Sequence, residues 1–246
     1  MANNFTTRAI TSLILLILFV FLYSLKLNYL FLILIFGIVY YELFNNKIIN
    51  LYFIFLLFLI YLFILYFIDN IFILALKYRI PLFSIFVIIT LISFMNLNIL
   101  LSKIFFNVFT FLCFVFFTLL YIDNYNIFFI IIFFTSINDI LAYIIGSYFK
   151  GPKIIPSISP NKTWSGTLSS YFISVALLFY LFDFAIVYNL LLPITFFIGD
   201  IYYSNFKRII NIKDYGSLIK GHGGVLDRLD SSFLSLSFSF LLFLFI

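Results

Sequence analysis

Long apolar runs are the feature that most constrains how this chain can fold. They recur from Ala9 to the C-terminus, and each has about 17 to 25 residues, enough for one helix to cross a bilayer. Only 9% of the residues are charged, whereas soluble globular chains carry about 25%. Lipid cannot satisfy free backbone N–H and C=O groups, so spanning segments must be helices or a closed barrel. The runs are continuous rather than alternating, which predicts helices.

The runs predict an all-α polytopic integral membrane protein with about nine transmembrane helices and two polar loops. The expected spans are residues 9–25, 28–44, 49–68, 80–98, 104–122, 127–146, 165–182, 184–203 and 231–246. The fourth is the least defined, because the preceding segment 70–79 is too short to span, and an interfacial helix is an alternative for it.

The basic residues predict how the spans are oriented. With a cytoplasmic N-terminus and nine spans, Lys26, Lys77 and Arg79 lie outside and the other basic residues lie inside, as the positive-inside rule requires. The same arrangement puts both polar loops, 147–164 and 204–230, on the cytoplasmic side. Basic residues flanking spans beside anionic lipid account for the net charge of +5, so we expect no nucleic-acid partner.

Two carboxylates lie inside predicted spans, where a charge is costly and commonly functional. Asp139 stands about two turns before the first loop, and a structural pair with a loop lysine is the alternative to a functional role. Glu42 lies near the inner end of the second span. It is equally consistent with a functional carboxylate and with snorkelling to the interface or pairing with Arg8.

The first loop has the composition of an anion-binding segment. Its prolines, Pro156 and Pro160, disfavour helix and leave backbone N–H groups free. Thr163 or Ser165 could cap the next helix, whose N-terminus attracts anions. Lysines, hydroxyls and a helix N-terminus together suit a polyphosphate. The lysines and hydroxyl residues are Lys150, Lys153, Lys162, Ser157, Ser159 and Thr163.

The second polar segment, 199–230, concentrates the charge of the chain. It holds four of the nine carboxylates, five of the fourteen basic residues and the only histidine. Asp200, Ser204, Lys207 and Arg208 follow one another at i, i+4, i+7 and i+8, so a helix would present them on one face. The carboxylates are Asp200, Asp214, Asp227 and Asp230; the basic residues are Lys207, Arg208, Lys213, Lys220 and Arg228.

This residue set predicts a hard-cation site for phosphate substrates. Carboxylates and hydroxyls without a cysteine cluster favour Mg²⁺ over Zn²⁺. Asp227 and Asp230 would share a face if their segment is helical. The turn Gly221-His222-Gly223-Gly224 allows a ligand to approach the backbone closely. We expect His222 to donate to a phosphate oxygen rather than to act as a base.

The ordered motifs resemble those of the phosphatidate cytidylyltransferases, or CDP-diacylglycerol synthases. They cover about the C-terminal half of the chain. The matching stretches are Asp139-Ile140-Leu141-Ala142-Tyr143, Ser157-Ile158-Ser159-Pro160-Asn161-Lys162-Thr163-Trp164, Ser204-Asn205-Phe206-Lys207-Arg208, Lys213-Asp214-Tyr215-Gly216 and Gly221-His222-Gly223-Gly224-Val225-Leu226-Asp227-Arg228-Leu229-Asp230.

Three positions depart from the family pattern. Lys220 stands where the family usually has Pro, and Ser165 stands where it has Glu. Ser147 with Lys150-Gly151 replaces a run of the type Gly-Arg-x-Phe-Gly-Lys. Because all four aspartates of the second segment are present, we expect an active enzyme.

The resemblance implies a reaction in which CTP and phosphatidate give CDP-diacylglycerol and pyrophosphate, the first committed step of phospholipid synthesis. It implies an integral protein, with a bacterial inner membrane as the expected location, and Mg²⁺ as the cofactor, with a second cation as an option. A homodimer is left open. Residues 1–103 would form N-terminal transmembrane helices, and residues 104–246 the catalytic transmembrane region of one continuous membrane domain.

The resemblance also implies residue roles. Asp200 and Asp227 would hold the metal, with Asp214 and Asp230 as further ligands or orienting groups. Lys207 and Arg208 would receive the lipid phosphate, although the lipid and nucleotide sites could be exchanged. The remaining substrate contacts are expected from Asp139, Ser159, Lys162, Thr163, Ser204, Lys213, Gly223, Gly224 and Arg228.

Two other functions are compatible with parts of the sequence. A CTP-dependent lipid kinase, or a cytidylyltransferase for an isoprenoid lipid, would use similar chemistry on another acceptor. A secondary transporter could use intramembrane acids, but transporters usually show internal repeats. No repeat is visible here, and the polar groups gather in loops on one side.

Overall fold

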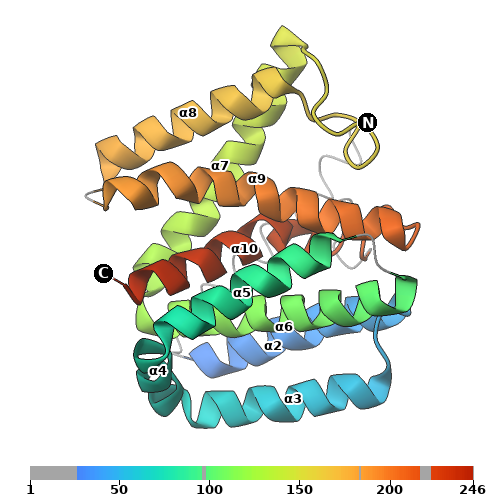
Figure 1. The fold of residues 1–246 in the computed structure, drawn as a ribbon, viewed down its shortest axis with the longest axis vertical. Helices are drawn as coiled ribbons and strands as arrows, with labels where there is room; N and C mark the ends of the chain where they lie inside the picture. Colours follow the sequence, from blue (N-terminus) through green and yellow to red (C-terminus); the bar gives the residue numbers. More distant parts are fainter. Residues whose placement is uncertain (1–26, 96–97, 183, 217–222, 246) are drawn as a thin grey trace.

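A computed structural model describes residues 27–95, 98–182, 184–216 and 223–245, and this part of the chain is helical (Figure 1). An isolated bridge between extended segments pairs Lys153 with Thr163. The described helices are α2 (Asn28–Asn45), α3 (Leu51–Tyr66), α4 (Ile68–Lys77), α5 (Arg79–Phe94), α6 (Ile99–Asp123), α7 (Tyr125–Phe149), α8 (Trp164–Leu181), α9 (Ile186–Ile209) and α10 (Leu226–Phe243).

The helices correspond to the predicted spans, which confirms an all-α polytopic membrane protein. The first predicted span, 9–25, lies outside the described residues. Five helices, α2 and α6 to α9, are long and apolar enough to cross a bilayer. The short segment predicted at 70–79 is α4, bent by 86° from α3, and the two would form a sixth span if counted together. The count of nine spans stays a prediction.

Helices α6 and α10 form the centre of the bundle. Helix α10 packs against both α6 and α9, while α7 packs mainly on α8 (Figure 1). Aromatic side chains fill much of this core: the rings of Phe106 and Phe206, from α6 and α9, stack with centroids 3.7 Å apart. The resulting packing fixes α9 and α10 side by side, and these two helices carry Asp200, Asp227 and Asp230.

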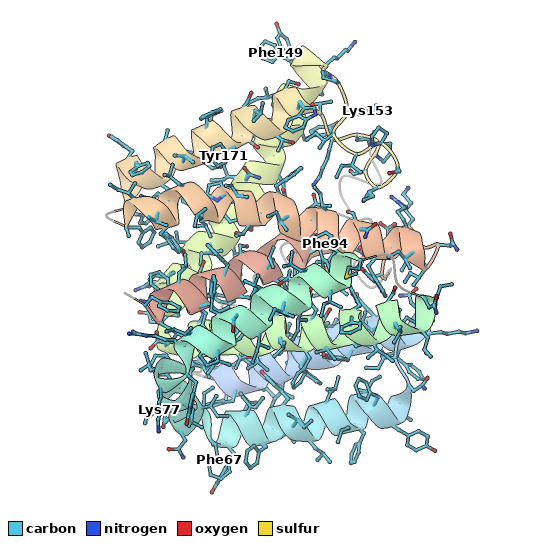
Figure 2. The ribbon with its side chains drawn as sticks, in the orientation of Figure 1. Phe67, Lys77, Phe94, Phe149, Lys153 and Tyr171 are labelled. Carbon is cyan, nitrogen blue, oxygen red and sulfur yellow. The ribbon has the colours of Figure 1, made fainter. Side chains whose placement is uncertain are left out.

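Both polar loops lie at the same end of the bundle, as predicted. The Arg208 guanidinium, at the end of α9, donates to the carbonyl oxygen of Ile158 in the α7–α8 loop at 3.1 Å. Lys77, beside the α4 corner, lies far from Lys153 in that loop (Figure 2). The bundle therefore has one polar end built from segments distant in sequence.

Candidate active site

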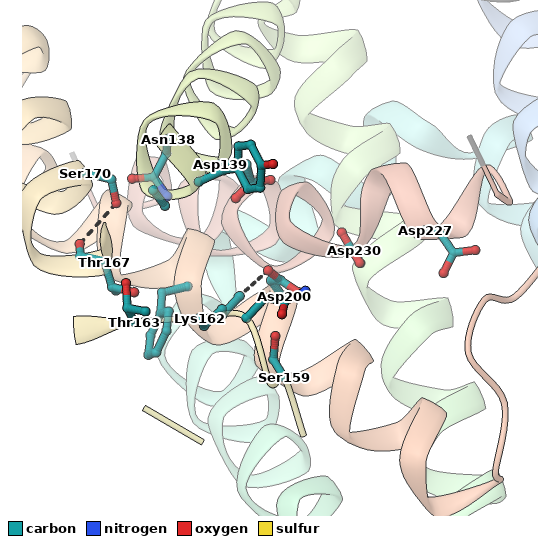
Figure 3. A pocket seen from close by; sticks show the side chains of 14 residues that line it. Asn138, Asp139, Ser159, Lys162, Thr163, Thr167, Ser170, Asp200, Asp227 and Asp230 are labelled. Atoms are coloured by element: carbon teal, nitrogen blue, oxygen red, sulfur yellow. Dashed lines mark hydrogen bonds and ion pairs between the residues drawn. The ribbon is translucent and has the colours of Figure 1, made fainter. Parts of the chain in front are cut away.

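A cavity of about 330 Å³ opens at the polar end, between α7, α8, α9, α10 and the α7–α8 loop. Four carboxylates and one lysine share it with several hydroxyl groups (Figure 3). Seven of the residues predicted from the sequence line the cavity: Asp139, Ser159, Lys162, Thr163, Asp200, Asp227 and Asp230.

The α7–α8 loop brings Lys162 into the cavity. The loop closes on itself, because the Ile154 N–H donates to the carbonyl oxygen of Lys162 at 3.1 Å. The hydroxyl oxygen of Thr163 accepts a hydrogen bond from the Gly166 N–H at 3.3 Å and caps α8, confirming one of the two predicted caps. Lys162 is thus held next to the N-terminus of a helix, where anions are favoured.

Asp200 receives two donors. The Lys162 ammonium forms an ion pair with Asp200 Oδ2, and the Ser204 hydroxyl, one turn along α9, donates to Asp200 Oδ1 at 3.1 Å. Both side chains of the ion pair keep about a quarter of their surface exposed. Lys162 therefore faces both a carboxylate and the open cavity, so phosphate oxygens entering the cavity would compete with Asp200 for it.

Lys207 forms a more deeply buried pair. Its ammonium lies 2.9 Å from Asp227 Oδ1 and 3.8 Å from Asp230 Oδ2, and the lysine is only 7% exposed. Asp227 and Asp230 lie in the first turns of α10, so the predicted helix is confirmed. Buried charges require partners, and Lys207 supplies one to both aspartates.

The second oxygen of Asp227 is held by backbone groups. Asp227 Oδ2 accepts hydrogen bonds from the N–H groups of Tyr215 at 2.8 Å and Gly224 at 3.0 Å. Burial raises the pKa of the Tyr215 phenol well above its usual range, so the phenol stays neutral and donates to the carbonyl oxygen of Tyr203 at 3.0 Å. Asp227 is therefore fixed in one orientation by the loop that precedes it.

Asp139 faces the same cavity from α7. The Ser231 hydroxyl of α10 donates to Asp139 Oδ2 at 3.3 Å. Asp139, Asp200 and Asp230 are close enough for their charges to repel one another. Such a cluster favours a bound cation or a cationic side chain between the carboxylates.

Several predicted residues lie elsewhere. Arg208, Lys213, Asp214 and Arg228 are exposed, and none of the four lines the cavity. Gly224 is buried and contributes its N–H to Asp227. Gly223 lies three residues before the start of α10, and His222 and Lys220 are outside the described residues.

The structure adds residues that the sequence interpretation did not include. Asn138 of α7 and Thr167 and Ser170 of α8 also line the cavity. Thr167 and Ser170 are polar residues spaced i, i+3 in an apolar span, a pattern that could have placed them on one inward face. Glu42, left open from the sequence, is 1% exposed and contacts the start of α10.

The carboxylate and hydroxyl oxygens that line the cavity are the type of ligand that Mg²⁺ prefers. Among the described residues, no three acidic, histidine or cysteine side chains are grouped closely enough to hold a metal ion together. Mg²⁺ needs no such protein cage, because it usually keeps several waters and binds one or two carboxylates together with substrate phosphates. Asp200 and Asp230 offer such a pair across the cavity between α9 and α10.

A second, largely apolar cavity of about 270 Å³ adjoins the first. It lies between α7, α8 and α9, and Pro193 and Ile194 of α9 form one wall. The two cavities meet at shared lining residues: Asn138, Thr167, Ser170 and Phe197. The polar cavity is therefore joined to a largely apolar cavity between α7, α8 and α9.

The model of the cytidylyltransferase family matches residues 6–246 of the chain. The chain is 40% identical over 119 residues to a phosphatidate cytidylyltransferase of Rickettsia conorii, covering 42% of this chain and 52% of the relative. A phosphatidate cytidylyltransferase of Brucella abortus biovar 1 is 43% identical over 100 residues, or 37% of each chain. The match thus spans about half the length of these curated relatives or less. No solved structure matches the chain.

Proposed function

The chain belongs to the cytidylyltransferase family, and from this premise we propose that it transfers the cytidylyl group of CTP to phosphatidate, giving CDP-diacylglycerol and pyrophosphate. The names of its curated relatives support the choice of lipid. The observation that carries the proposal is the polar cavity itself. It combines carboxylates and Lys162 at one end of a membrane bundle, and it connects to an apolar cavity.

The reaction needs positioning more than acid–base chemistry. An oxygen of the lipid phosphate attacks the α-phosphorus of CTP, the bond from this phosphorus to the bridging oxygen breaks, and pyrophosphate leaves with the bonding electrons. A phosphate monoester is largely ionised at neutral pH, so the nucleophile requires no strong base. The main barrier is bringing two polyanions together in line, which fixed cationic groups can lower.

Lys162 is the residue that we assign to the nucleotide phosphates. It is the lysine that lines the cavity, and its position beside the α8 N-terminus adds a favourable dipole. Ser159 and Thr163 line the same wall and supply hydroxyl groups. Together they would bind and orient the triphosphate before the lipid phosphate attacks.

Asp200 and Asp230 would hold Mg²⁺, with Asp227 as a further ligand through lone pairs not used by its present partners. The metal would neutralise charge on the phosphates and polarise the attacked phosphorus centre. A second cation would bind in the same carboxylate-lined cavity. Because Lys207 is buried against Asp227 and Asp230, we assign it to holding these carboxylates, in place of the lipid-phosphate role expected from the sequence.

The apolar cavity is the part that we assign to the acyl chains. It adjoins the polar cavity at Asn138 and Ser170. A lipid could therefore lie along α8 and α9 with its phosphate at the carboxylates, entering laterally from the bilayer. We place the polar end on the cytoplasmic side of a bacterial inner membrane. Lysines are numerous at this end, among them Lys47, Lys103, Lys150 and Lys153.

Filling the apolar cavity should weaken lipid use selectively. In Ile194→Trp, the larger side chain would occupy space between α8 and α9, so we expect the KM for phosphatidate to rise about tenfold, equivalent to ~1.4 kcal/mol, while the KM for CTP stays unchanged. Steady-state kinetics in mixed micelles would measure both constants. Leu190→Trp, on an exposed position of the same helix outside the cavity wall, is the matched control. An equal rise in both KM values would contradict the assignment.

The proposed function is tested by label transfer with detergent-purified protein. CTP labelled at the α-phosphate, phosphatidate and Mg²⁺ should give label in the lipid phase, and omission of phosphatidate or Mg²⁺ should abolish it. Transfer to an isoprenoid phosphate but not to phosphatidate would identify another acceptor. Intact CTP binding without transfer to either lipid would refute the proposed activity.

A further inference from the structure

Glu42 is the only glutamate of the chain, and it lies against the segment that carries Asp227. Its two carboxylate oxygens accept hydrogen bonds from the N–H groups of Val225 at 2.8 Å and Leu226 at 2.9 Å. These two donors belong to the start of α10, more than 180 residues further along the chain. Glu42 itself is 1% exposed. A buried carboxylate must be compensated by hydrogen bonds, and here two backbone N–H groups compensate it. Glu42 therefore has a structural contact and is not a solvated surface charge.

Helix α10 depends on this contact for its first N–H groups. Its own N-cap residue, Val225, provides no side-chain acceptor. The first N–H groups of a helix have no partner within it, and a carboxylate there also interacts favourably with the helix dipole. Glu42 therefore takes the place of a local cap, and it does so from another helix.

The same end of α2 also holds the beginning of the preceding loop. The side-chain amide of Asn46, one turn after Glu42, donates to the carbonyl oxygen of Tyr215 and to the carbonyl oxygen of Glu42 at 2.8 Å. Tyr215 in turn donates its N–H to Asp227. Residues 215 and 225–226 are thus held by neighbouring turns of one helix.

Two glycines leave room for the Glu42 carboxylate. A Cβ atom on Gly216 would lie 2.7 Å from Glu42 Oε1, and one on Gly224 would lie 2.6 Å from Oε2. Both distances are too short for any side chain unless the carboxylate moves. Gly216 and Gly224 therefore allow the backbone at these two positions to approach the Glu42 carboxylate closely.

We propose that Glu42 is a positioning residue, which holds the start of α10 at Val225 and Leu226 so that Asp227 and Asp230 face the substrate phosphates. The inference rests on the proposed function for its kinetic part only. Glu42 touches the backbone of the loop and not the cavity, so it acts through the two aspartates. Its loss should loosen their orientation and weaken the binding of Mg²⁺ with the nucleotide.

The test uses Glu42→Gln in the full chain, with Asp69→Asn at the opposite end as the matched change of carboxylate to amide. The amide has one acceptor oxygen and would point N–H groups at one of the two backbone donors. We expect the Mg²⁺ concentration at half-maximal lipid labelling to rise at least about tenfold, the lower bound for lost supporting contacts at metal sites. Asp69→Asn should keep the wild-type value.

Hydrogen–deuterium exchange without Mg²⁺ or CTP supplies the second readout. Peptides covering 223–230 should exchange faster in Glu42→Gln, while peptides from α6 should keep their protection. Wild-type exchange with a wild-type Mg²⁺ response would overturn the proposal, and so would a uniform loss of protection, which marks a merely structural role. If wild-type protein fails to label lipid, the proposed function falls, but the exchange result still decides whether Glu42 holds the start of α10.

A second variant covers the case in which Glu42→Gln does not accumulate in membranes. Gly216→Ala keeps the carboxylate but displaces it, so it should change exchange and Mg²⁺ dependence in the same direction. In a Glu42→Ala background the added methyl meets no carboxylate, and the alanine at 216 should have less effect than in wild type. Equal effects in both backgrounds would contradict the proposed role of Glu42.

Discussion

Asp227→Asn should reduce the transfer of label from CTP to lipid by about 10³-fold, the upper end of the range for loss of one preorganised electrostatic group in an active site. The change removes the charge that pairs with Lys207 at 2.9 Å. It also turns an amide N–H₂ group toward either Lys207 or the N–H groups of Tyr215 and Gly224, which need acceptors. One substitution thus disturbs the metal ligand and its supporting loop together.

The measurement is the initial rate of lipid labelling at saturating CTP, phosphatidate and Mg²⁺. Asp69→Asn, the same chemical change at the other end of the bundle, is the control and should keep the wild-type rate. Size-exclusion elution and thermal unfolding in detergent would show whether the variant remains folded. A folded Asp227→Asn protein with more than a tenth of the wild-type rate would remove Asp227 from the reaction.

The spans and the order of the polar motifs were predictable because they depend on local properties of the sequence. Continuous apolar runs must form helices in lipid, and eight of the expected spans correspond to described helices. The shared face of Asp227 and Asp230 follows from helical spacing alone. The meeting of the two loops followed from the odd–even alternation of successive spans, supported by the distribution of lysines.

Contacts between distant helices were not predictable from local pattern. Glu42 lies near the end of α2, and nothing in its neighbourhood indicates that Val225 and Leu226 will be its partners. Asp214 shows the opposite case: it stands in a conspicuous motif, yet its side chain is exposed while the adjacent Tyr215 is buried. Neighbouring loop residues point in different directions, and only the backbone path decides which of them enters the site.

Lys207→Met should have the second-largest effect, on stability as well as on activity. Methionine fills a similar volume but leaves Asp227 and Asp230 without the ammonium that they share. Removing one partner of a buried ion pair costs about 3–5 kcal/mol. We therefore expect a clear decrease in the thermal unfolding temperature in detergent, together with loss of lipid labelling.

The double variant Lys207→Met/Asp227→Asn separates the two effects. It removes the ammonium together with its nearer partner, Asp227 at 2.9 Å, and leaves only Asp230, the partner at 3.8 Å, without compensation. Replacing both members of a buried pair is often close to neutral for stability. We expect part of the thermal stability to return, since only Asp230 stays uncompensated, while lipid labelling stays absent because the reaction still lacks the Asp227 carboxylate. Recovery of activity together with stability would mean that the pair only supports the fold. No gain in stability over Lys207→Met would mean that the contact with Asp230, and not the pair with Asp227, carries the stabilising effect of Lys207.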